Sequence, residues 1–196
     1  MHNGEARGRP RDPRIDKAVL NAAAAVFRER GFHSASIMEI ARRAGVGTPA
    51  VYRRWPSKEQ LAADLVIGAV SPSLPDTGNL RRDLTEFLRE RFAMYTDTMY
   101  LHLVLTLLAF AAVNRADAAF VARGYEVTRA PLQARLQIAL DRGELAPGTD
   151  IRLIGDLVSG AVHIPFMYTG IPRRPRDYDR VIAGILDGVA HSPRNA

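Results

Sequence analysis

Apolar residues recur at intervals of three and four along most of the chain, a spacing typical of one face of an α-helix. The first such pattern begins at Arg14 and is made by Ile15, Val19, Ala22, Ala23, Val26 and Phe27. Gly31 is predicted to end this helix, because glycine readily adopts the backbone conformation that closes a helix. Ser36 and Glu39 then have the spacing of a capping box, which predicts a second, short helix through Ala44.

Two further helix starts follow. Thr48 is predicted as an N-cap and Pro49 as the first helical residue, so that a third helix covers residues 48–55. Trp55, at the end of this helix, is expected to pack in the core rather than stack on a base. A proline then interrupts the pattern, and a second capping box, Ser57-Lys58-Glu59-Gln60, opens a fourth helix to about residue 70.

The rest of the chain carries longer helical patterns. A segment rich in proline, serine and glycine separates them from the first four helices. The predicted helices span residues 79–96, 98–114, 116–142, 150–169 and 177–190. No segment alternates between apolar and polar residues as a half-buried strand does, so an all-α fold of about nine helices is predicted.

These patterns divide the chain into parts. Residues 1–13 are rich in glycine, proline and arginine, and we expect a flexible basic arm there. Residues 14–58 are expected to form a three-helix head, and residues 59–71 a connecting helix. Residues 79–192 are expected to form a larger helical body.

Charge separates the head from the body more clearly than helix length does. The chain has 196 residues, is 47% hydrophobic, lacks cysteine and carries a net charge of +6. This composition excludes wholesale disorder, a disulfide scaffold, cysteine-based zinc sites and a cysteine nucleophile. Residues 1–58 hold twelve basic and five acidic side chains, a net charge of +7, so the whole excess lies in the first third. This distribution favours a head that faces a polyanion; the alternative is a solvated basic surface.

Residues 37–54 have the pattern of a helix–turn–helix. Ala41 is small where two helices touch, Gly45 can take a positive φ in the turn, and Val51 buries the second helix against the first. This arrangement would present the start of helix 48–55 to the major groove of DNA. The alternative is an ordinary corner between two helices with a glycine turn, which the basic charge of the same segment disfavours.

Candidate DNA contacts follow from side-chain chemistry. Tyr52 and Lys58 suit phosphate oxygens, and Arg53 is the best candidate for a bidentate contact to guanine. Arg43 and Arg54 are expected either to contact phosphates or only to solvate the surface. The other members of the predicted DNA-binding set are Ser36, Gly47, Thr48, Pro49 and Ala50, with Arg7, Arg9 and Arg11 in the arm. The small residues at the start of the third helix would allow close approach to a sugar or a thymine methyl group, and the arm either enters a minor groove or stays in solvent.

Residues 14–66 resemble the DNA-binding domain of the TetR/AcrR transcriptional regulators. The matching residues are Ala22-x3-Val26-Phe27, Arg30-Gly31-Phe32, Ser36-Ile37-x2-Ile40-Ala41-x2-Ala44-Gly45-Val46 and Val51-Tyr52-Arg53-Arg54-Trp55-Pro56-Ser57-Lys58-Glu59-x-Leu61. This combined string covers about a quarter of the chain and is highly specific. The body is similar to one C-terminal ligand-binding subtype, mainly from Leu157 to Pro172, although His163 and Pro165 depart from its pattern.

The resemblance implies a homodimer that binds a palindromic operator and is released by a small, largely apolar effector. Family members usually dimerise through their last two long helices, which correspond here to 150–169 and 177–190. The dimer interface is accordingly predicted at Ile154, Val158, Ala161, Pro165, Val181, Ile185 and Val189. The alternative is that both apolar stripes belong to the core of the protomer.

The body also carries aromatic, methionine and histidine side chains on the helices that the family packs around its ligand. Methionine suits irregular apolar pockets, and ligand sites are mostly apolar with few polar groups. The predicted ligand-binding set is Phe92, Tyr95, Met99, His102, Leu103, Phe110, Tyr125, His163 and Met167. For each of these residues the alternative is an ordinary core position.

Other function classes find little support in the sequence. The five histidines lack a metal-ligand spacing such as His-x3-His, and the sequence contains neither a glycine-rich phosphate loop nor Gly-x-Ser-x-Gly. We therefore expect no catalytic residue, metal or cofactor. The longest apolar stretch, Leu101–Val113, is about 13 residues, shorter than the ~20 that cross a bilayer, and no signal peptide is recognisable. A cytoplasmic protein that does not enter the membrane is expected.

The sequence thus predicts a ligand-responsive DNA-binding transcriptional regulator, expected to be a repressor, with double-stranded operator DNA and a second copy of itself as partners. The alternative is an architectural DNA-binding protein that tolerates many sequences and has no inducer.

Overall fold

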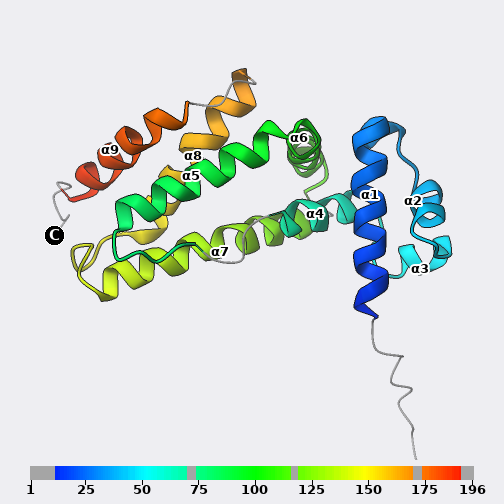
Figure 1. The fold of residues 1–196 in the computed structure, drawn as a ribbon, viewed down its shortest axis with the longest axis horizontal. Helices are drawn as coiled ribbons and strands as arrows, with labels where there is room; N and C mark the ends of the chain where they lie inside the picture. Colours follow the sequence, from blue (N-terminus) through cyan, green and yellow to red (C-terminus); the bar gives the residue numbers. More distant parts are fainter. Residues whose placement is uncertain (1–11, 70–73, 116–118, 170–173, 191–196) are drawn as a thin grey trace, which may run out of the picture. The chain divides into compact units, whose positions relative to one another are not determined.

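The computed structural model describes residues 12–69, 74–115, 119–169 and 174–190, and these ranges are helical with short connections (Figure 1). The helices are α1 (Pro13–Ser34), α2 (Ile37–Arg43), α3 (Thr48–Tyr52), α4 (Lys58–Gly68), α5 (Leu80–Thr96), α6 (Thr98–Val113), α7 (Ala119–Asp141), α8 (Ile151–Thr169) and α9 (Tyr178–Ala190), with a short 3-10 helix at Pro175–Asp177 before α9. This confirms the predicted all-α fold. The chain divides into two compact units, residues 1–65 and 66–196, and the division falls inside α4.

The first of these units contains the predicted head. In it α2 packs on α1 and α3 packs on α2 to form a small bundle. Its buried core includes Val19, Ala23, Val26, Phe27, Ile40, Ala41, Val51, Trp55 and Leu61. Trp55 is buried as predicted, and its indole nitrogen donates a hydrogen bond of 2.8 Å to Asp64 on α4. The spacing of apolar residues in α1 therefore does mark the face that meets α2.

Both predicted capping serines are confirmed. The hydroxyl of Ser36 accepts a hydrogen bond of 3.2 Å from the backbone nitrogen of Glu39, and Ser57 accepts one of 3.2 Å from Gln60. Each serine satisfies one of the backbone donors that a helix start leaves without an intrahelical partner.

Gly31 interrupts the first helix as predicted: with a φ of +74° and a ψ of 165° it is non-helical and forms a kink, after which a further short helical segment carries α1 to Ser34. Both ends of α3 differ from the sequence-based prediction. The N-cap of α3 is Gly47 rather than Thr48, so Pro49 is the second helical residue. Helix α3 also ends at Tyr52, before the predicted end at residue 55, although Arg53 keeps a helical conformation and the backbone nitrogen of Trp55 still donates to Val51 at 2.9 Å.

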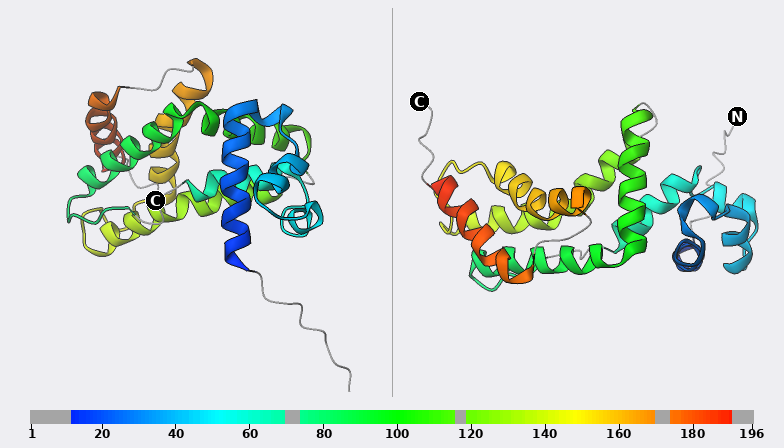
Figure 2. Two further views of the ribbon diagram at one scale, coloured as in Figure 1. Left: turned by 45° about the vertical axis from the view of Figure 1, so that its right-hand side comes forward. Right: turned by 90° about the horizontal axis from the view of Figure 1, so that it is seen from above.

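The body is built around α5, which packs against α7, α8 and α9 (Figure 1). Its core is made mainly of leucine, isoleucine, valine and aromatic residues, among them Leu84, Leu88, Leu132, Leu136, Ile154, Val158, Val162 and Ile182. Helix α6 leaves the end of α5 at an angle of 92°, and Figure 2 shows this sharp bend. In the described part of the chain no single helix is long and apolar enough to cross a membrane; α5 and α6 meet that criterion only as a pair, across this bend.

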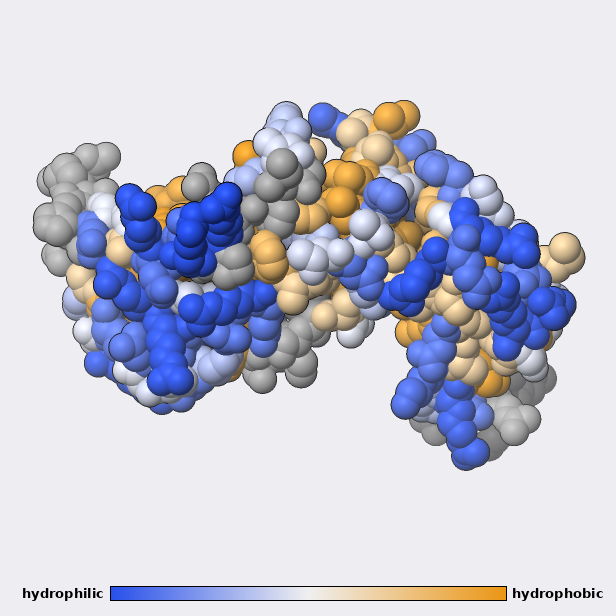
Figure 3. Space-filling view, turned by 45° about the horizontal axis from the view of Figure 1, so that its top comes forward, coloured by the Kyte–Doolittle hydropathy of each residue, from blue (hydrophilic) through white to orange (hydrophobic). Residues whose placement is uncertain are grey.

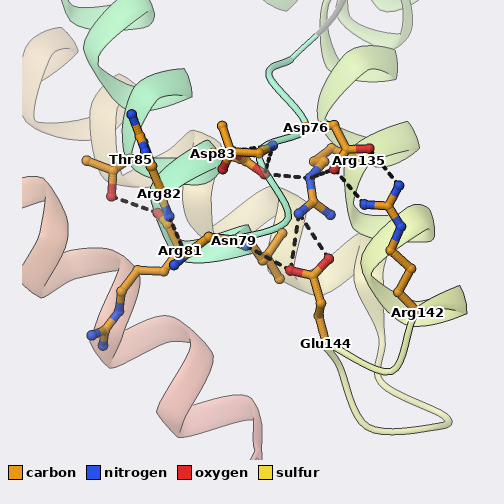
Figure 4. Close-up of polar contacts among 11 residues, drawn as sticks. Asp76, Asn79, Arg81, Arg82, Asp83, Thr85, Arg135, Arg142 and Glu144 are labelled. Carbon is orange, nitrogen blue, oxygen red and sulfur yellow. Dashed lines mark hydrogen bonds and ion pairs between the residues drawn. The ribbon is translucent and has the colours of Figure 1, made fainter.

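A buried ionic cluster fastens the start of α5 to the end of α7 (Figure 4). The Arg135 side chain is 2% exposed, and it donates hydrogen bonds of 2.8 Å to Asp83 and 3.0 Å to Glu144. The two carboxylates have further donors, since Thr77 binds Asp83 and the backbone nitrogen of Leu80 binds Glu144 at 2.9 Å. These partners of the carboxylates matter, because removing one member of a buried ion pair leaves the other as a buried charge without an opposite charge.

We predict that Arg135→Met lowers the free energy of unfolding by about 3–5 kcal/mol, because Asp83 would stay buried without its cation. The matched control is Arg142→Met, which breaks the partly exposed pair with Asp76 at 2.7 Å and should cost less than about 1 kcal/mol. Urea denaturation followed by circular dichroism measures both. Equal losses for the two variants would contradict the special role of the buried pair.

Candidate functional site

The turn between α2 and α3 has the hydrogen bonds of a Schellman motif. The backbone nitrogen of Val46 donates to the carbonyl of Ala41 at 3.0 Å, and that of Gly45 donates to Arg42 at 3.2 Å. Gly45 has a φ of +69°, which a residue with a side chain rarely adopts. The position of glycine in the sequence therefore sets the direction in which α3 leaves α2.

Helix α3 presents one buried and several accessible side chains. Val51 is fully buried and holds the helix against α2. Tyr52 is 49% exposed, and Pro49 and Arg53 are also exposed. The predicted contact residues of this helix therefore lie together on its accessible surface.

Lys58, a predicted phosphate contact, is bound to backbone carbonyl groups of the head. Its ammonium group donates hydrogen bonds to the carbonyl oxygens of Phe32 (2.7 Å), His33 (3.2 Å) and Ala35 (2.9 Å), and it lies 4.5 Å from the centre of the Phe32 ring. An ammonium has three N–H donors, and all three are used here. Lys58 therefore joins the start of α4 to the link between α1 and α2, which leaves it no free donor for a phosphate.

Two arginines of the predicted set are also engaged within the head. The Arg54 side chain pairs with Asp16 on α1 and donates a hydrogen bond of 3.1 Å to the carbonyl of Ala50. Arg43 donates two hydrogen bonds of 2.7 Å to Glu29, so its planar guanidinium is matched to a carboxylate. Both contacts link α1 to the helix–turn–helix.

Glu39 binds the two arginines at the end of α2. It accepts hydrogen bonds from Arg42 and Arg43, and these bonds lower its pKa to about 2. The side chain of Arg42 is nevertheless 71% exposed beside the turn. Arg42 was not in the predicted DNA-binding set, although its place in the basic segment was a signal that could have included it.

The predicted DNA-binding set thus separates into two groups. Thr48, Pro49, Ala50, Tyr52 and Arg53 lie side by side in α3 or at its end. The other described members support the fold locally: Ser36 and Gly47 are N-caps, and Arg43, Arg54 and Lys58 are bound within the head. Arg7, Arg9 and Arg11 lie outside the described residues.

The predicted ligand-binding residues occupy several separate places in the body. Tyr95, Met99 and Leu103 are buried, Phe92, Phe110 and His163 are half-buried, and His102, Tyr125 and Met167 are exposed. The structure brings Tyr95 and His163 together, with ring centres 5.3 Å apart. Phe92 instead packs on Tyr178 and Phe110 on Phe120, while the Tyr125 hydroxyl donates to Asp156 at 3.1 Å.

A surface cleft of about 420 Å³ lies elsewhere in the body. It is lined by Gly78, Asn79, Leu80, Arg81, Glu144, Leu145, Ala146, Thr149, Leu186, Asp187 and Val189. These residues come from the start of α5, the connection after α7 and the end of α9, and none of them belongs to the predicted ligand-binding set.

The predicted dimer residues also differ in their accessibility. Ile154 and Val158 are fully buried in the protomer core, so they offer no surface to a partner, and the other five are half-buried. The opposite face of α8 carries the exposed apolar residues Leu153, Leu157, Ile164, Met167 and Tyr168. Elsewhere, too, hydrophobic residues reach the surface in patches among hydrophilic ones, as Figure 3 shows.

Comparison with known proteins matches both units to one family. Residues 19–65 match the bacterial regulatory proteins of the tetR family, and residues 74–185 match the tetracyclin repressor-like C-terminal domain. The first match contains the helix–turn–helix, and the second covers most of the body.

Relatives and solved structures agree with this assignment. The chain is 29% identical over 174 residues to the HTH-type transcriptional regulator AqdR of Rhodococcus erythropolis, covering 86% of this chain and 82% of AqdR. The crystal structure of the TetR family transcription regulator SCO0332 superposes with a TM-score of 0.73 at 26% identity, covering 91% of this chain and 99% of the other. The fold is also shared by the regulator FadR of Bacillus subtilis, solved in complex with stearoyl-CoA, with a TM-score of 0.58 at 18% identity, covering 88% and 98%. The chain therefore belongs to the TetR family of DNA-binding transcriptional regulators.

Proposed function

We propose that this regulator is a repressor that binds a palindromic operator as a homodimer and leaves it when a small molecule binds the body. The observation that carries the proposal is the geometry of α3, which is held by a Schellman turn and a buried valine and exposes Tyr52 and Arg53. As a regulator of bacterial genes it would act in the cytoplasm, and its function needs no catalytic residue, metal or cofactor.

The accessible side chains of α3 suit both base recognition and phosphate binding. Arg53 carries a guanidinium that can donate two parallel hydrogen bonds to guanine, and Tyr52 carries a hydroxyl that can bind a phosphate. Thr48, Pro49 and Ala50 are small enough to let the backbone approach the groove. Arg43, Arg54 and Lys58 act on DNA only by holding this helix in place.

The exposed face of α8 supports a homodimer. Leu153, Leu157, Gly160, Ile164 and Met167 follow one another at alternating steps of four and three residues, which is the spacing of a helix–helix seam. Gly160 lies at the middle of this stripe, and a Cβ at that position would meet no atom within 4 Å. A small residue at the centre allows the same helix of a second copy to approach closely, as a two-fold interface requires. We therefore place the interface on this stripe, together with the half-buried residues Ala161 and Pro165.

The body is the part that would bind the effector. Its fold is shared with FadR of Bacillus subtilis, which holds stearoyl-CoA. Its core brings the rings of Tyr95, His163 and Phe166 into contact, so that a phenol and an imidazole lie among apolar side chains. Such a combination is typical of small-molecule sites.

The DNA contacts can be tested on a duplex selected from a random pool by the full chain. Tyr52→Phe should weaken binding to every sequence alike and leave the salt dependence of the affinity unchanged, because a neutral hydroxyl that binds a phosphate releases no counterion. Arg53→Ala should lower the affinity for the selected sequence by about 1–3 kcal/mol and relax the preference at one base pair. Fluorescence anisotropy over a salt series measures both. Failure to select any sequence would favour the architectural alternative, and a uniform loss for Arg53→Ala would overturn its role in base recognition.

The supporting role of Lys58 leads to a different outcome for its substitution. Lys58→Met leaves three carbonyl groups without their donor, and we expect the unfolding free energy of the head to fall by about 1–3 kcal/mol. Trp55, the single tryptophan of the chain, reports on the head by fluorescence during urea denaturation. Lys17→Met, at an exposed lysine of α1, is the control and should change stability by less than about 0.5 kcal/mol. If Lys58→Met keeps wild-type stability but loses DNA affinity, Lys58 is a phosphate ligand after all.

The dimer interface can be tested with two leucines of similar exposure. Leu157→Asp, at a position 44% exposed on α8, should convert the dimer into a monomer, because the same charge would enter the interface from both copies. Leu108→Asp, at a position 40% exposed on α6, should leave the dimer intact. Light scattering after size-exclusion chromatography gives the mass of each. A monomer for the Leu108 variant and a dimer for the Leu157 variant would place the interface elsewhere.

A further inference from the structure

Three arginines of the described chain are buried, and one of them lacks an acidic partner. Arg135 is 2% exposed and binds Asp83 and Glu144. Arg129 is 6% exposed and lies 3.5 Å from Glu126 and 3.7 Å from Asp156. Arg91 is 8% exposed, and no carboxylate among the described residues lies within ion-pair distance of it.

The hydrogen bond and the ring contact that Arg91 makes within the described residues are both with neutral groups. One terminal nitrogen donates a hydrogen bond of 2.9 Å to the carbonyl of Thr128 on α7, and the guanidinium carbon lies 4.7 Å from the centre of the Phe87 ring. Burial lowers the pKa of Arg91, while the nearby Tyr95 and Glu90 raise it. An arginine nevertheless stays protonated in proteins, so α5 places a positive charge in the body that has no ion pair among the described residues and is stabilised by a carboxylate only through space, by the preceding Glu90.

A neutral hydrogen-bond donor lies next to this charge. Tyr95 is one helical turn after Arg91 on α5, so the two side chains share a face. Burial raises the pKa of Tyr95 to about 12, and the phenol therefore keeps its proton. Its ring packs against Phe166 with a centroid distance of 5.1 Å.

His163 closes the group from α8 without adding a charge. Its Nδ1 lies 2.6 Å from the carbonyl oxygen of Ser159, and because a carbonyl can only accept, Nδ1 carries the hydrogen. Burial lowers the pKa of His163 and the charge of Arg91 adds to this effect, while the hydrogen bond to Ser159 opposes it, so the net shift favours the neutral ring. Its other nitrogen is then an acceptor. The cluster thus offers one cation, one hydroxyl donor and aromatic walls.

We propose that Arg91 and Tyr95 form the site for the anionic head of the effector, and that the effector is an apolar molecule with a single carboxylate. One negative charge balances the one unpaired guanidinium, whereas a dianionic phosphate would leave an excess charge in the same apolar surroundings. The carboxylate takes the free N–H groups of Arg91 and the hydroxyl hydrogen of Tyr95, and the apolar part lies along Phe87 and Phe166. This inference rests on the proposed function and names the chemical class of its small molecule.

The test measures binding to the full chain by calorimetry, with octanoate and dodecanoate as probes and octanol, dodecanol and dodecyl phosphate as matched comparisons. Wild type should bind a carboxylate at least about tenfold more tightly than its alcohol, and more tightly than the phosphate. Arg91→Met should weaken carboxylate binding about tenfold to a hundredfold and leave alcohol binding unchanged. Arg89→Met, on the exposed side of the same helix, is the control and should bind like wild type.

Thermal denaturation of the free variants separates a binding role from a structural one. Arg91→Met leaves no buried carboxylate without its partner, so its melting temperature should equal or exceed that of wild type. Tyr95→Phe keeps the ring and removes only the hydroxyl, and it should weaken carboxylate binding about threefold to tenfold. If Arg91→Met does not fold, two measurements still test the proposed carboxylate site. They are carboxylate binding by Tyr95→Phe and the comparison of carboxylate with alcohol binding by wild type.

Several results would overturn the proposal. One is that wild type and Arg91→Met bind the carboxylates with equal affinity. Another is that wild type binds the alcohols or the phosphate more tightly than the carboxylates. The third is that wild type binds no carboxylate probe. Because no DNA is present in these measurements, such a failure would leave the tests of operator binding and dimerisation unaffected.

Discussion

Helix α3 has only five residues, and a helix of that length is not stable by itself. Everything that the head can present to DNA therefore depends on the contacts that hold α3 against α2. Val51 supplies the buried anchor, and the positive φ of Gly45 sets the direction of the turn. The ammonium of Lys58 fixes the following helix to the end of α1. The basic charge of the head is thereby divided: part of it is used inside the fold, and part, including Arg53, remains on the surface.

The buried arginines of the body also fall into two kinds. Arg135 and Arg129 are buried with acidic partners, and the first of them joins α5 to the end of α7. Arg91 is buried on α5, one helical turn before Tyr95, and no carboxylate in the described part of the chain lies within ion-pair distance of it. A buried arginine with carboxylate partners stabilises one arrangement of the helices, whereas one without an ion pair favours a ligand that brings a negative charge. The same residue type thus holds the body together in one place and is available for recognition in another.

Local sequence was enough to predict the helices, the two capping serines, the burial of Trp55 and the turn at Gly45, because these depend on neighbours along the chain. It was not enough for Lys58, Arg54 and Arg43, whose partners lie on α1 or at its end and are brought near only by the fold. Helix α8 shows the same limit. It is apolar on two faces, and the packing of α5 and α7 decides that Ile154 is buried while Leu157 is exposed. The predicted ligand-binding residues are distributed over several places, because Phe92 packs on Tyr178 and Phe110 on Phe120, and those partners are set by the packing of the helices.

The central claim is that α3 reads a specific sequence and that two copies do so together. Hydroxyl-radical footprinting of the full chain on its selected duplex tests this claim most directly. The account predicts two protected segments on the same face of the DNA, related by a two-fold axis and separated by about one helical turn or a multiple of it. A single protected half-site, or uninterrupted protection that spreads along the duplex as the protein concentration rises, would contradict it.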